Sequence, residues 1–296
     1  EGEIHEDDAA FALASALMGE GVSIQGEPKE GKINIIADRD GLLKIDTDGL
    51  LQFNMLPDIM CATLHDNTVV RKDRVVAGTR AIPLVMREEV LHEARKIGEA
   101  ARESKAAAGR TGIVEVKAMR RPKAGVVITG NEVYSGRIRD SFASIIQEKI
   151  QVFDGDIAGI VQAPDDERLI EAGLRELLDR GADLLITTGG MSVDPDDVTR
   201  FAIRRLGTIH MTYGSAVLPG AMFLVAYLPA PDRQFPIPVL GIPACAMYHK
   251  ITVLDLILPR VLAGEIIGRK DLAELGHGGL CLNCKECRFP VCPFGK

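Results

Sequence analysis

The sequence predicts an α/β fold with a mostly parallel sheet covered by helices on both faces, between a small β-rich N-terminal domain and a Cys-rich C-terminal tail. Three observations lead to this prediction. Apolar strand-like runs alternate with amphipathic helical segments over residues 122–268, as in a parallel sheet buried on both sides. Short β-rich runs separated by Gly and Asp turns fill residues 22–85. Four of the six cysteines lie within residues 281–296.

The N-terminal part of the chain is predicted to hold a helix and a small β-rich domain over residues 1–85. Residues 7–18 form an Ala-rich segment that favours a short helix, which Gly19 would end. A charged helix follows over residues 86–108, which we interpret as a solvated linker or a packing helix. Residues 86–121 together are interpreted as a helical linker.

From residue 122 the strands and helices alternate. Asp165 can cap the start of the helix over residues 165–181, and Gly181 can end it. The predicted strands are 124–129, 157–161, 183–187, 223–228 and 237–243, and the predicted helices are 141–150, 165–181 and 245–262. The remaining residues, 269–296, are interpreted as a Cys-cluster tail.

Composition excludes several classes of protein. Apolar residues make up 46% of the chain and charged residues 26%, which is typical of a globular cytoplasmic protein. The net charge of −7 argues against nucleic-acid binding, which depends on excess Lys and Arg. No apolar run reaches the length of a membrane span, so we expect no membrane partner. The chain opens on Glu1 and not on Met, so we expect a fragment or a trimmed chain.

Four loops are the candidates for a ligand site, because ligands bind beyond the carboxyl ends of the strands in sheets of this kind. The loops 129–141, 187–197 and 241–248 each follow a predicted strand and precede a predicted helix. The fourth segment, 217–222, lies between two predicted strands.

The acidic loop "TTGGMSVDPDD" (187–197) has two interpretations. In the first, Asp194 is a helix N-cap, Pro195 takes the first helical position, and Asp196 and Asp197 favour the positive end of the helix dipole. That interpretation leaves the paired glycines and the serine before it without a role.

The second interpretation is a phosphate site with a divalent cation. Gly189 and Gly190 would let backbone N–H groups approach a phosphate, and Ser192 would add a donor. Mg²⁺ binds through one or two carboxylates together with substrate oxygens, so the three aspartates would hold the metal beside the phosphate. We favour this interpretation.

The loop at 129–141 adds further candidates. Thr129 and Gly130 can offer a hydroxyl and an amide to an anion, and Glu132 can join the metal cluster. Asp140 and Ser141 begin the next predicted helix, where they can act as a plain N-cap or as ligand contacts.

These segments together resemble the molybdopterin-binding domain shared by the molybdenum-cofactor biosynthesis proteins MoeA, MogA and MoaB. "TGNEVYSGRIRDS" resembles the MoeA-type "TGDEL…G.I.DSN", "TTGGMSVDPDDV" its "TSGGVSVGDYD", "VLPG" its "KPGKP", and "LGIPACAMY" its "LPGNPVS". The four segments stand in the same order across residues 122–268.

The resemblance implies a function in molybdenum-cofactor biosynthesis. The implied chemistry is Mg²⁺-dependent hydrolysis of adenylylated molybdopterin with molybdate transfer to the dithiolene, and we also expect a homo-oligomer. Carried over by motif, Asp194, Asp196, Asp197 and Glu132 would hold or orient the metal and water. The residues that would contact molybdopterin are Thr129, Gly130, Asp140, Ser141, Gly189, Gly190, Ser192, Pro219, Gly220 and Pro243.

The departures from the family pattern lie where cations would be expected. Both lysines of "KPGKP" are replaced, by Leu218 and Ala221, and losing two cations weakens a site for phosphate or molybdate. The resemblance therefore supports pterin binding more firmly than molybdenum insertion. A non-catalytic molybdopterin carrier or a redox-responsive regulator is one alternative. A second is a hydrolase of nucleotide pyrophosphates like the CinA group, whose "GG.GPT.DD.T" loop is similar to "GGMSVDPDDVT".

The tail "CLNCKECRFPVCPFGK" predicts a metal centre. Cys281, Cys284, Cys287 and Cys292 are spaced C-x2-C-x2-C-x4-C, and two-residue gaps let successive thiolates turn around one metal. The spacing is close to that of bacterial ferredoxins, so an iron–sulfur cluster leads and Zn²⁺ comes next. A disordered or oxidised tail is the remaining alternative.

Overall fold

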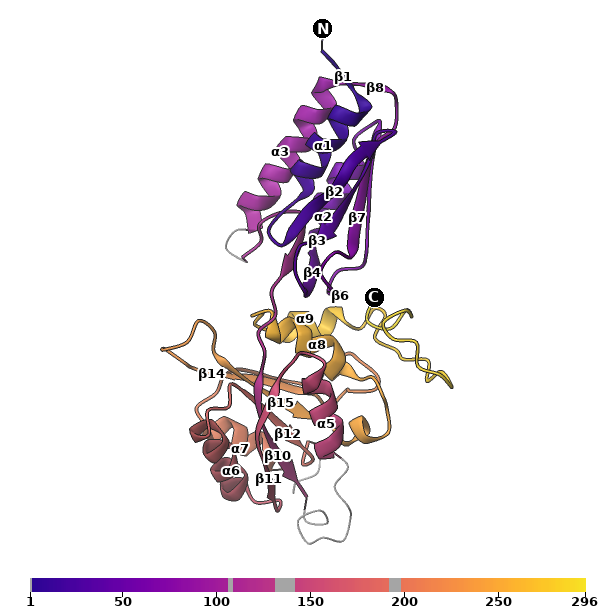
Figure 1. The fold of residues 1–296 in the computed structure, drawn as a ribbon. Helices are drawn as coiled ribbons and strands as arrows, with labels where there is room; N and C mark the ends of the chain where they lie inside the picture. Colours follow the sequence, from indigo (N-terminus) through magenta and orange to yellow (C-terminus); the bar gives the residue numbers. More distant parts are fainter. Residues whose placement is uncertain (1, 106–108, 131–141, 192–197) are drawn as a thin grey trace. The chain divides into compact units, whose positions relative to one another are not determined.

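The computed structural model of the chain divides into two compact units, Glu1–Met119 and Arg120–Lys296 (Figure 1). It describes residues 2–105, 109–130, 142–191 and 198–296. Within these residues every helix is too short or too polar to cross a lipid bilayer.

The N-terminal unit combines an antiparallel sheet with two long helices. Four strands form the sheet in the order β2-β3-β7-β5, and a smaller sheet has the order β6-β4-β9. A third pairing joins the short strands β1 and β8. The helices are α1 (Glu6–Leu17), α2 (Thr47–Asn54) and α3 (Glu88–Lys105). The strands are β1 (Glu3–His5), β2 (Val22–Lys29), β3 (Lys32–Ala37), β4 (Gly41–Ile45), β5 (Ile59–Thr63), β6 (Val69–Val70), β7 (Val75–Ala81), β8 (Val85–Arg87) and β9 (Val114–Lys117).

The segment expected to be a solvated linker is part of this unit up to Met119. Val90, Leu91 and Ala94 of α3 are buried in its core. A Cβ built on Gly98 would lie 2.1 Å from the carbonyl oxygen of Ala16, so α3 and α1 pack with their backbones close together. Of the two interpretations of this charged helix, the packing helix is therefore the one that agrees with the structure.

The C-terminal unit is built on one six-stranded sheet with the order β11-β10-β12-β15-β14-β13. The first four strands in this order are parallel, and β14 runs antiparallel to both of its neighbours. The strands are β10 (Lys123–Thr129), β11 (Asp156–Ala163), β12 (Leu184–Thr188), β13 (Ile209–Tyr213), β14 (Leu224–Leu228) and β15 (Ile237–Ile242).

Helices lie on both sides of this sheet, as predicted, with α6 and α7 on one side and α5 and α8 on the other (Figure 1). Alternate residues of each buried strand point to opposite faces, so Val127 and Leu185 join Leu174 and Ile203 in one core cluster. The helices are α5 (Phe142–Gln151), α6 (Glu167–Asp179), α7 (Thr199–Arg205), α8 (Val253–Leu262) and α9 (Arg269–Glu274). The expected mostly parallel α/β fold is therefore confirmed.

Two local expectations are corrected by capping geometry. Asp166, and not Asp165, caps α6, because its carboxylate accepts hydrogen bonds from the N–H groups of Arg168 and Leu169. The helix expected over residues 245–262 is interrupted: a short 3₁₀ turn, η2, covers Ala244–Met247, and α8 begins only at Val253. Thr252 and Asp255 form a capping box at that point, which fixes the start of α8.

Candidate functional site

Three of the four predicted loops meet around one cavity of about 590 Å³, which we call the loop pocket. It lies at the carboxyl ends of β12 and β15, where a ligand site is expected in such a sheet. Five of the residues predicted to contact a ligand line it, namely Gly189, Gly190, Pro219, Gly220 and Pro243. The other lining residues are Met191, Leu218, Ala221, Met222, Ala244, Cys245, His249, Leu280, Cys281 and Asn283.

The paired glycines have a packing role that the motif alone does not show. Gly189 has a φ of +83°, and a Cβ there would lie 2.4 Å from the carbonyl oxygen of Thr129. Gly190 has a φ of +54°, and its Cβ would lie 2.3 Å from Oγ1 of Thr199. Any larger residue would strain the backbone and also clash, so these glycines let β10, α7 and the pocket wall approach one another.

Thr129 and Gly130 are placed at the end of β10, but neither lines the loop pocket. The Thr129 hydroxyl is buried and donates to the carbonyl of Thr188 at 3.0 Å. The Gly130 N–H donates to the carbonyl of Ala163 at 3.3 Å. Both groups already have hydrogen-bond partners here, and their contact with an anion stays a prediction.

The acidic candidates lie outside the described residues. This applies to Glu132, Asp140, Ser141, Ser192, Asp194, Asp196 and Asp197. The helix α7 begins at Thr199, and its N-cap Val198 makes no side-chain capping bond. The choice between capping and metal binding for the three aspartates is therefore not decided by the geometry of α7.

The C-terminal tail forms part of the pocket wall, which the sequence reasoning missed. The Leu218 N–H donates to the carbonyl of Gly279, and the Cys281 N–H donates to the carbonyl of Leu218, both at 2.8 Å. This short parallel bridge brings Leu280, Cys281 and Asn283 to the loop pocket. Backbone pairing of this kind leaves no side-chain signature, so the motif around Leu218 gave no sign of it.

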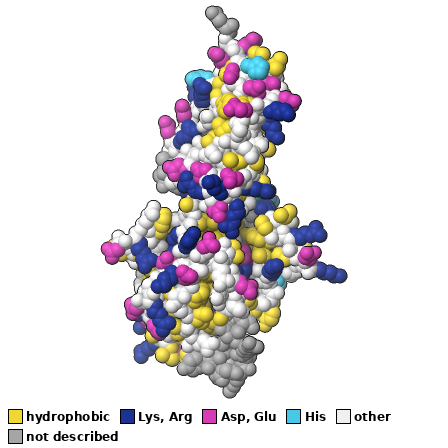
Figure 2. Space-filling view, viewed as in Figure 1, with side chains coloured by type: hydrophobic (Ala, Val, Ile, Leu, Met, Phe, Trp, Pro, Cys, Tyr) yellow, Lys and Arg dark blue, Asp and Glu magenta, His cyan; other side chains and the backbone are white. Residues whose placement is uncertain are grey.

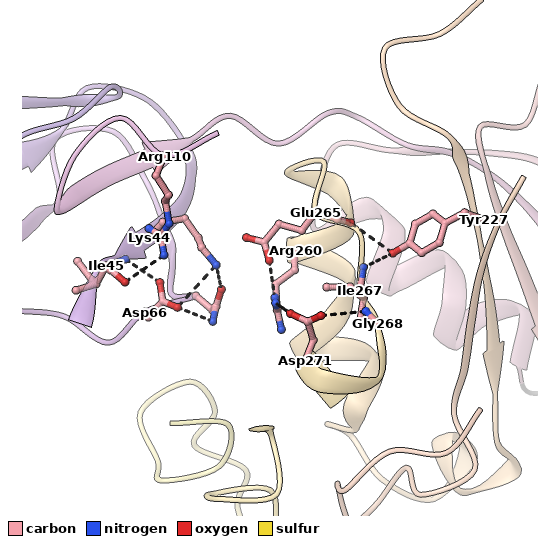
Figure 3. A network of polar contacts seen from close by, with 11 residues as sticks. Lys44, Ile45, Asp66, Arg110, Tyr227, Arg260, Glu265, Ile267, Gly268 and Asp271 are labelled. Atoms are coloured by element: carbon pink, nitrogen blue, oxygen red, sulfur yellow. Dashed lines mark hydrogen bonds and ion pairs between the residues drawn. The ribbon is translucent and has the colours of Figure 1, made fainter. Parts of the chain in front are cut away.

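A partly buried polar network joins the end of α8 to the start of α9 (Figure 3). Arg260 donates to Glu265 at 2.7 Å and to Asp271 at 2.5 Å, and the Gly268 N–H donates to Asp271 at 2.9 Å. Burial opposes ionisation of Asp271, but the Gly268 hydrogen bond and the Arg260 charge outweigh it, so its pKa lies below the ordinary value. The hydroxyl of Tyr227 accepts a hydrogen bond from the Ile267 N–H at 2.7 Å.

The tail also encloses a second cavity of about 620 Å³, the tail cavity, lined by residues 248–251, 280–289 and 292–294. It shares His249, Leu280, Cys281 and Asn283 with the loop pocket, and His249 Nδ1 lies 3.1 Å from Asn283 Oδ1.

The four tail cysteines line the tail cavity as free thiols. Among the described residues, no group of three or more His, Cys, Asp or Glu side chains is placed so that it could hold a metal ion. The cysteines as placed therefore do not form a coordination site, and the predicted iron–sulfur cluster or zinc would require them to move together.

The fold and the loop pocket define an α/β ligand-binding domain with its site at the carboxyl edge of a mostly parallel sheet. Residues 125–263 match the family model described as "Probable molybdopterin binding domain". The C-terminal unit thus matches a molybdopterin-binding domain over most of its length, as the motifs predicted.

Curated relatives match over a shorter stretch. A "CinA-like protein" of Mycobacterium avium is 37% identical over 83 residues, which are 28% of this chain and 19% of that protein. A "CinA-like protein" of Mycolicibacterium gilvum is 36% identical over 83 residues, 28% of this chain and 20% of that protein. The match thus spans about a fifth of the length of these relatives.

Among solved structures, the molybdopterin biosynthesis enzyme MoaB of Thermus thermophilus covers 49% of this chain and 98% of its own, with 21% identity and a TM-score of 0.39. The protein CinA of Thermoplasma acidophilum covers 43% of this chain and 91% of its own, with 17% identity and a TM-score of 0.37. At these TM-scores neither likeness carries a function to this chain.

Proposed function

We propose that the C-terminal unit binds molybdopterin in the loop pocket and acts in molybdenum-cofactor biosynthesis, with MoeA-like molybdate insertion as its reaction. The observation that supports this most directly is that Gly189, Gly190, Pro219, Gly220 and Pro243 meet at one cavity. These residues come from three loops that are separate in sequence and were each singled out by their motifs.

The lining of the loop pocket suits the flat ring system of a pterin better than its charged groups. Among the residues that the structure describes, it contains neither Lys nor Arg, and Leu218 and Ala221 stand where the family pattern has lysines. In this proposal Mg²⁺ held by the aspartates of the acidic loop neutralises the phosphate, because carboxylates next to a phosphate repel it unless a cation lies between them. Mg²⁺ would supply that charge and polarise the phosphate during hydrolysis of adenylylated molybdopterin.

The test begins with the ligand that copurifies with the protein. Protein from cells that make the molybdenum cofactor is denatured, and the released compound is identified by mass spectrometry. We expect a pterin phosphate, and we expect Ala221→Trp to carry less than about a tenth of the wild-type amount, because Ala221 is an exposed lining residue whose enlargement fills the loop pocket. The control Leu169→Trp places the same ring on the exposed surface of α6 and should retain the pterin.

A second arm tests the magnesium role. Calorimetry of the pterin phosphate with and without Mg²⁺ should show tighter binding with the metal, and Asp196→Asn combined with Asp197→Asn should remove that difference. Equal affinity with and without Mg²⁺ would contradict metal binding by the aspartates and would favour helix capping as their role. A nucleotide in place of the pterin, or equal loading of Ala221→Trp, would contradict the proposal as a whole.

The metal centre of the tail, the homo-oligomer and the cytoplasmic location remain proposals as well. Closely spaced thiols favour a metal because thiolates repel one another without a cation. Protein purified without oxygen should contain iron or about one zinc ion per chain by elemental analysis. Light scattering should give the mass of two or more chains, each of 32.0 kDa. A metal-free monomer would contradict the metal and oligomer proposals.

A second candidate function is hydrolysis of a nucleotide pyrophosphate, as in the CinA group. The match to CinA-like proteins at 36–37% identity favours it. Under this proposal a nucleotide diphosphate compound would occupy the loop pocket, and Mg²⁺-dependent release of a nucleoside monophosphate would be measurable. Release that Ala221→Trp abolishes would favour this candidate over pterin binding.

A further inference from the structure

We infer that the tail cavity is a second binding site, separate from the loop pocket, for a nucleoside monophosphate: a phosphate ester joined to a flat aromatic base. The inference rests on the charge and the rings that surround this cavity, and it does not depend on what the loop pocket binds.

The cations of the tail cavity are the first observation. Lys250, Lys285 and Arg288 line it, and only one acid, Glu286, lines it with them. The chain as a whole carries a net charge of −7, and Figure 2 shows acidic and basic side chains interspersed over its visible face. A cavity with three cations is therefore a local reversal of the charge of the chain.

The second observation is that these cations are not used by the fold. Many basic side chains of the C-terminal unit are paired, such as Arg120 with Asp183 and Lys149 with Asp255. Within the described part of the chain, the side chains of Lys250, Lys285 and Arg288 make neither a hydrogen bond nor an ion pair. Their donors are free for a ligand, and a phosphate offers several acceptor oxygens to them.

The rings are the third observation. Tyr248 lines the tail cavity and is 79% exposed, so most of its ring is free to contact a ligand. Phe289 lines the cavity as well and is only half-buried, in an edge-to-face contact with Phe294. Aromatic faces stack on nucleobases whatever the base, and a cavity of about 620 Å³ is of the size that holds small-molecule ligands. Cations alone would suit inorganic phosphate; cations with rings favour a nucleotide.

The loop that lines the tail cavity is held in place at both of its ends. Backbone bonds hold the two ends of the loop that carries Lys285 and Arg288: Cys281 pairs with Leu218, and the Gly295 N–H donates to the carbonyl of Gly278 at 3.0 Å. Phe294 is buried, which fastens the end of the chain. Lys285 and Arg288 therefore stand on a loop that is closed at its base, and Lys250 faces the same cavity from the segment before α8.

The experiment uses the full chain, reduced and treated with chelator so that no metal occupies the cysteines. Calorimetry compares adenosine monophosphate, adenosine and inorganic phosphate at one salt concentration. We expect the monophosphate to bind at least tenfold more tightly than either of the other two. Lys285→Ala combined with Arg288→Ala should weaken it at least tenfold, and Tyr248→Ala should reduce its advantage over phosphate.

Two controls separate this site from its alternatives. Arg168→Ala combined with Lys270→Ala removes the same charge from exposed positions that line neither cavity, and it should bind the monophosphate like the wild type. Ala221→Trp blocks the loop pocket and should also leave monophosphate binding unchanged. Equal weakening in the charge-matched control, or loss in Ala221→Trp with none in the tail variant, would overturn the inference. If Ala221→Trp loses monophosphate binding and the tail variant does not, the nucleotide occupies the loop pocket. The proposed function is tested separately, by the pterin that copurifies with the protein.

Discussion

The two cavities of the C-terminal unit lie next to each other, yet the described residues that line them differ in charge and polarity. The described lining of the loop pocket consists mostly of glycines, prolines and apolar side chains at the carboxyl edge of the sheet, and contains no Lys or Arg. The tail cavity is formed by residues 248–251 together with the loop after the last helix, and it carries three cations and the four tail cysteines. Among the described residues, the sheet loops thus supply the shape of the loop pocket, whereas the positive charge lies around the tail cavity.

The largest effect on stability is expected where the shape of the loop pocket depends on a missing side chain. Gly189→Ala should lower the free energy of unfolding by about 3 kcal/mol, because a Cβ would strain a φ of +83° and lie 2.4 Å from the Thr129 carbonyl oxygen. Gly207→Ala is the matched control: its φ is +84°, but nothing lies within 4 Å of the added Cβ. It should cost about 1 kcal/mol. Denaturant unfolding measures both, and equal losses would show that the close approach does not matter.

The difference in charge between the two cavities can be tested by adding lysines to the lining of the loop pocket. Leu218→Lys with Ala221→Lys should tighten phosphate binding by about 1.5–3 kcal/mol for each well-placed charge-assisted bond. Both positions are exposed and line the pocket, so the fold should tolerate the change. Calorimetry with phosphate and with molybdate provides the measurement. An unchanged affinity would mean that the segment 217–222 does not face the anion.

A smaller effect is expected at the base of the tail, where Asp271 joins α9 to Arg260. The pKa of Asp271 is lowered in the folded protein, so its contribution to stability is present above its unfolded pKa and is lost as the pH falls through its folded pKa. Asp271→Asn should cost about 1 kcal/mol at pH 7 and should make stability depend less on pH in the acid range. Thermal unfolding from pH 7 to pH 2 tests this. Wild-type and variant curves that stay parallel would contradict it.

The smallest effect is a difference in the rate of alkylation among the cysteines of the chain. Burial raises the pKa of the Cys245 thiol in the loop pocket, and burial raises the pKa of Cys61 in the N-terminal unit to about 12. Cys284 and Cys287 of the tail are exposed. Since the thiolate is the reactive form, we expect alkylation at pH 7 in the order of tail cysteines first, then Cys245, with Cys61 slowest. Mass spectrometry of timed samples gives the order, and early labelling of Cys245 would show that the loop pocket is more open than described.

The sequence by itself determined the α/β class, the mostly parallel sheet and the positions of its ligand loops. Strands buried on both faces must be apolar throughout, so β10 and β12 could be found from composition alone. Because the carboxyl ends of the parallel strands β12 and β15 share one edge of the sheet, the meeting of Gly189 with Pro243 could be expected as well.

Only the tertiary structure decided what depends on backbone contacts between distant segments. Charged α3 looked like a linker, but its few buried side chains and Gly98 place it against α1. The tail cysteines suggested a separate metal centre, whereas Leu218 pairs with the tail and makes it a wall of the loop pocket. Every residue except proline carries the same backbone N–H and C=O groups, so the side chains do not indicate such pairing. Residues 218 and 281 are neighbours because the sheet, α8 and α9 bring these distant segments of the chain together.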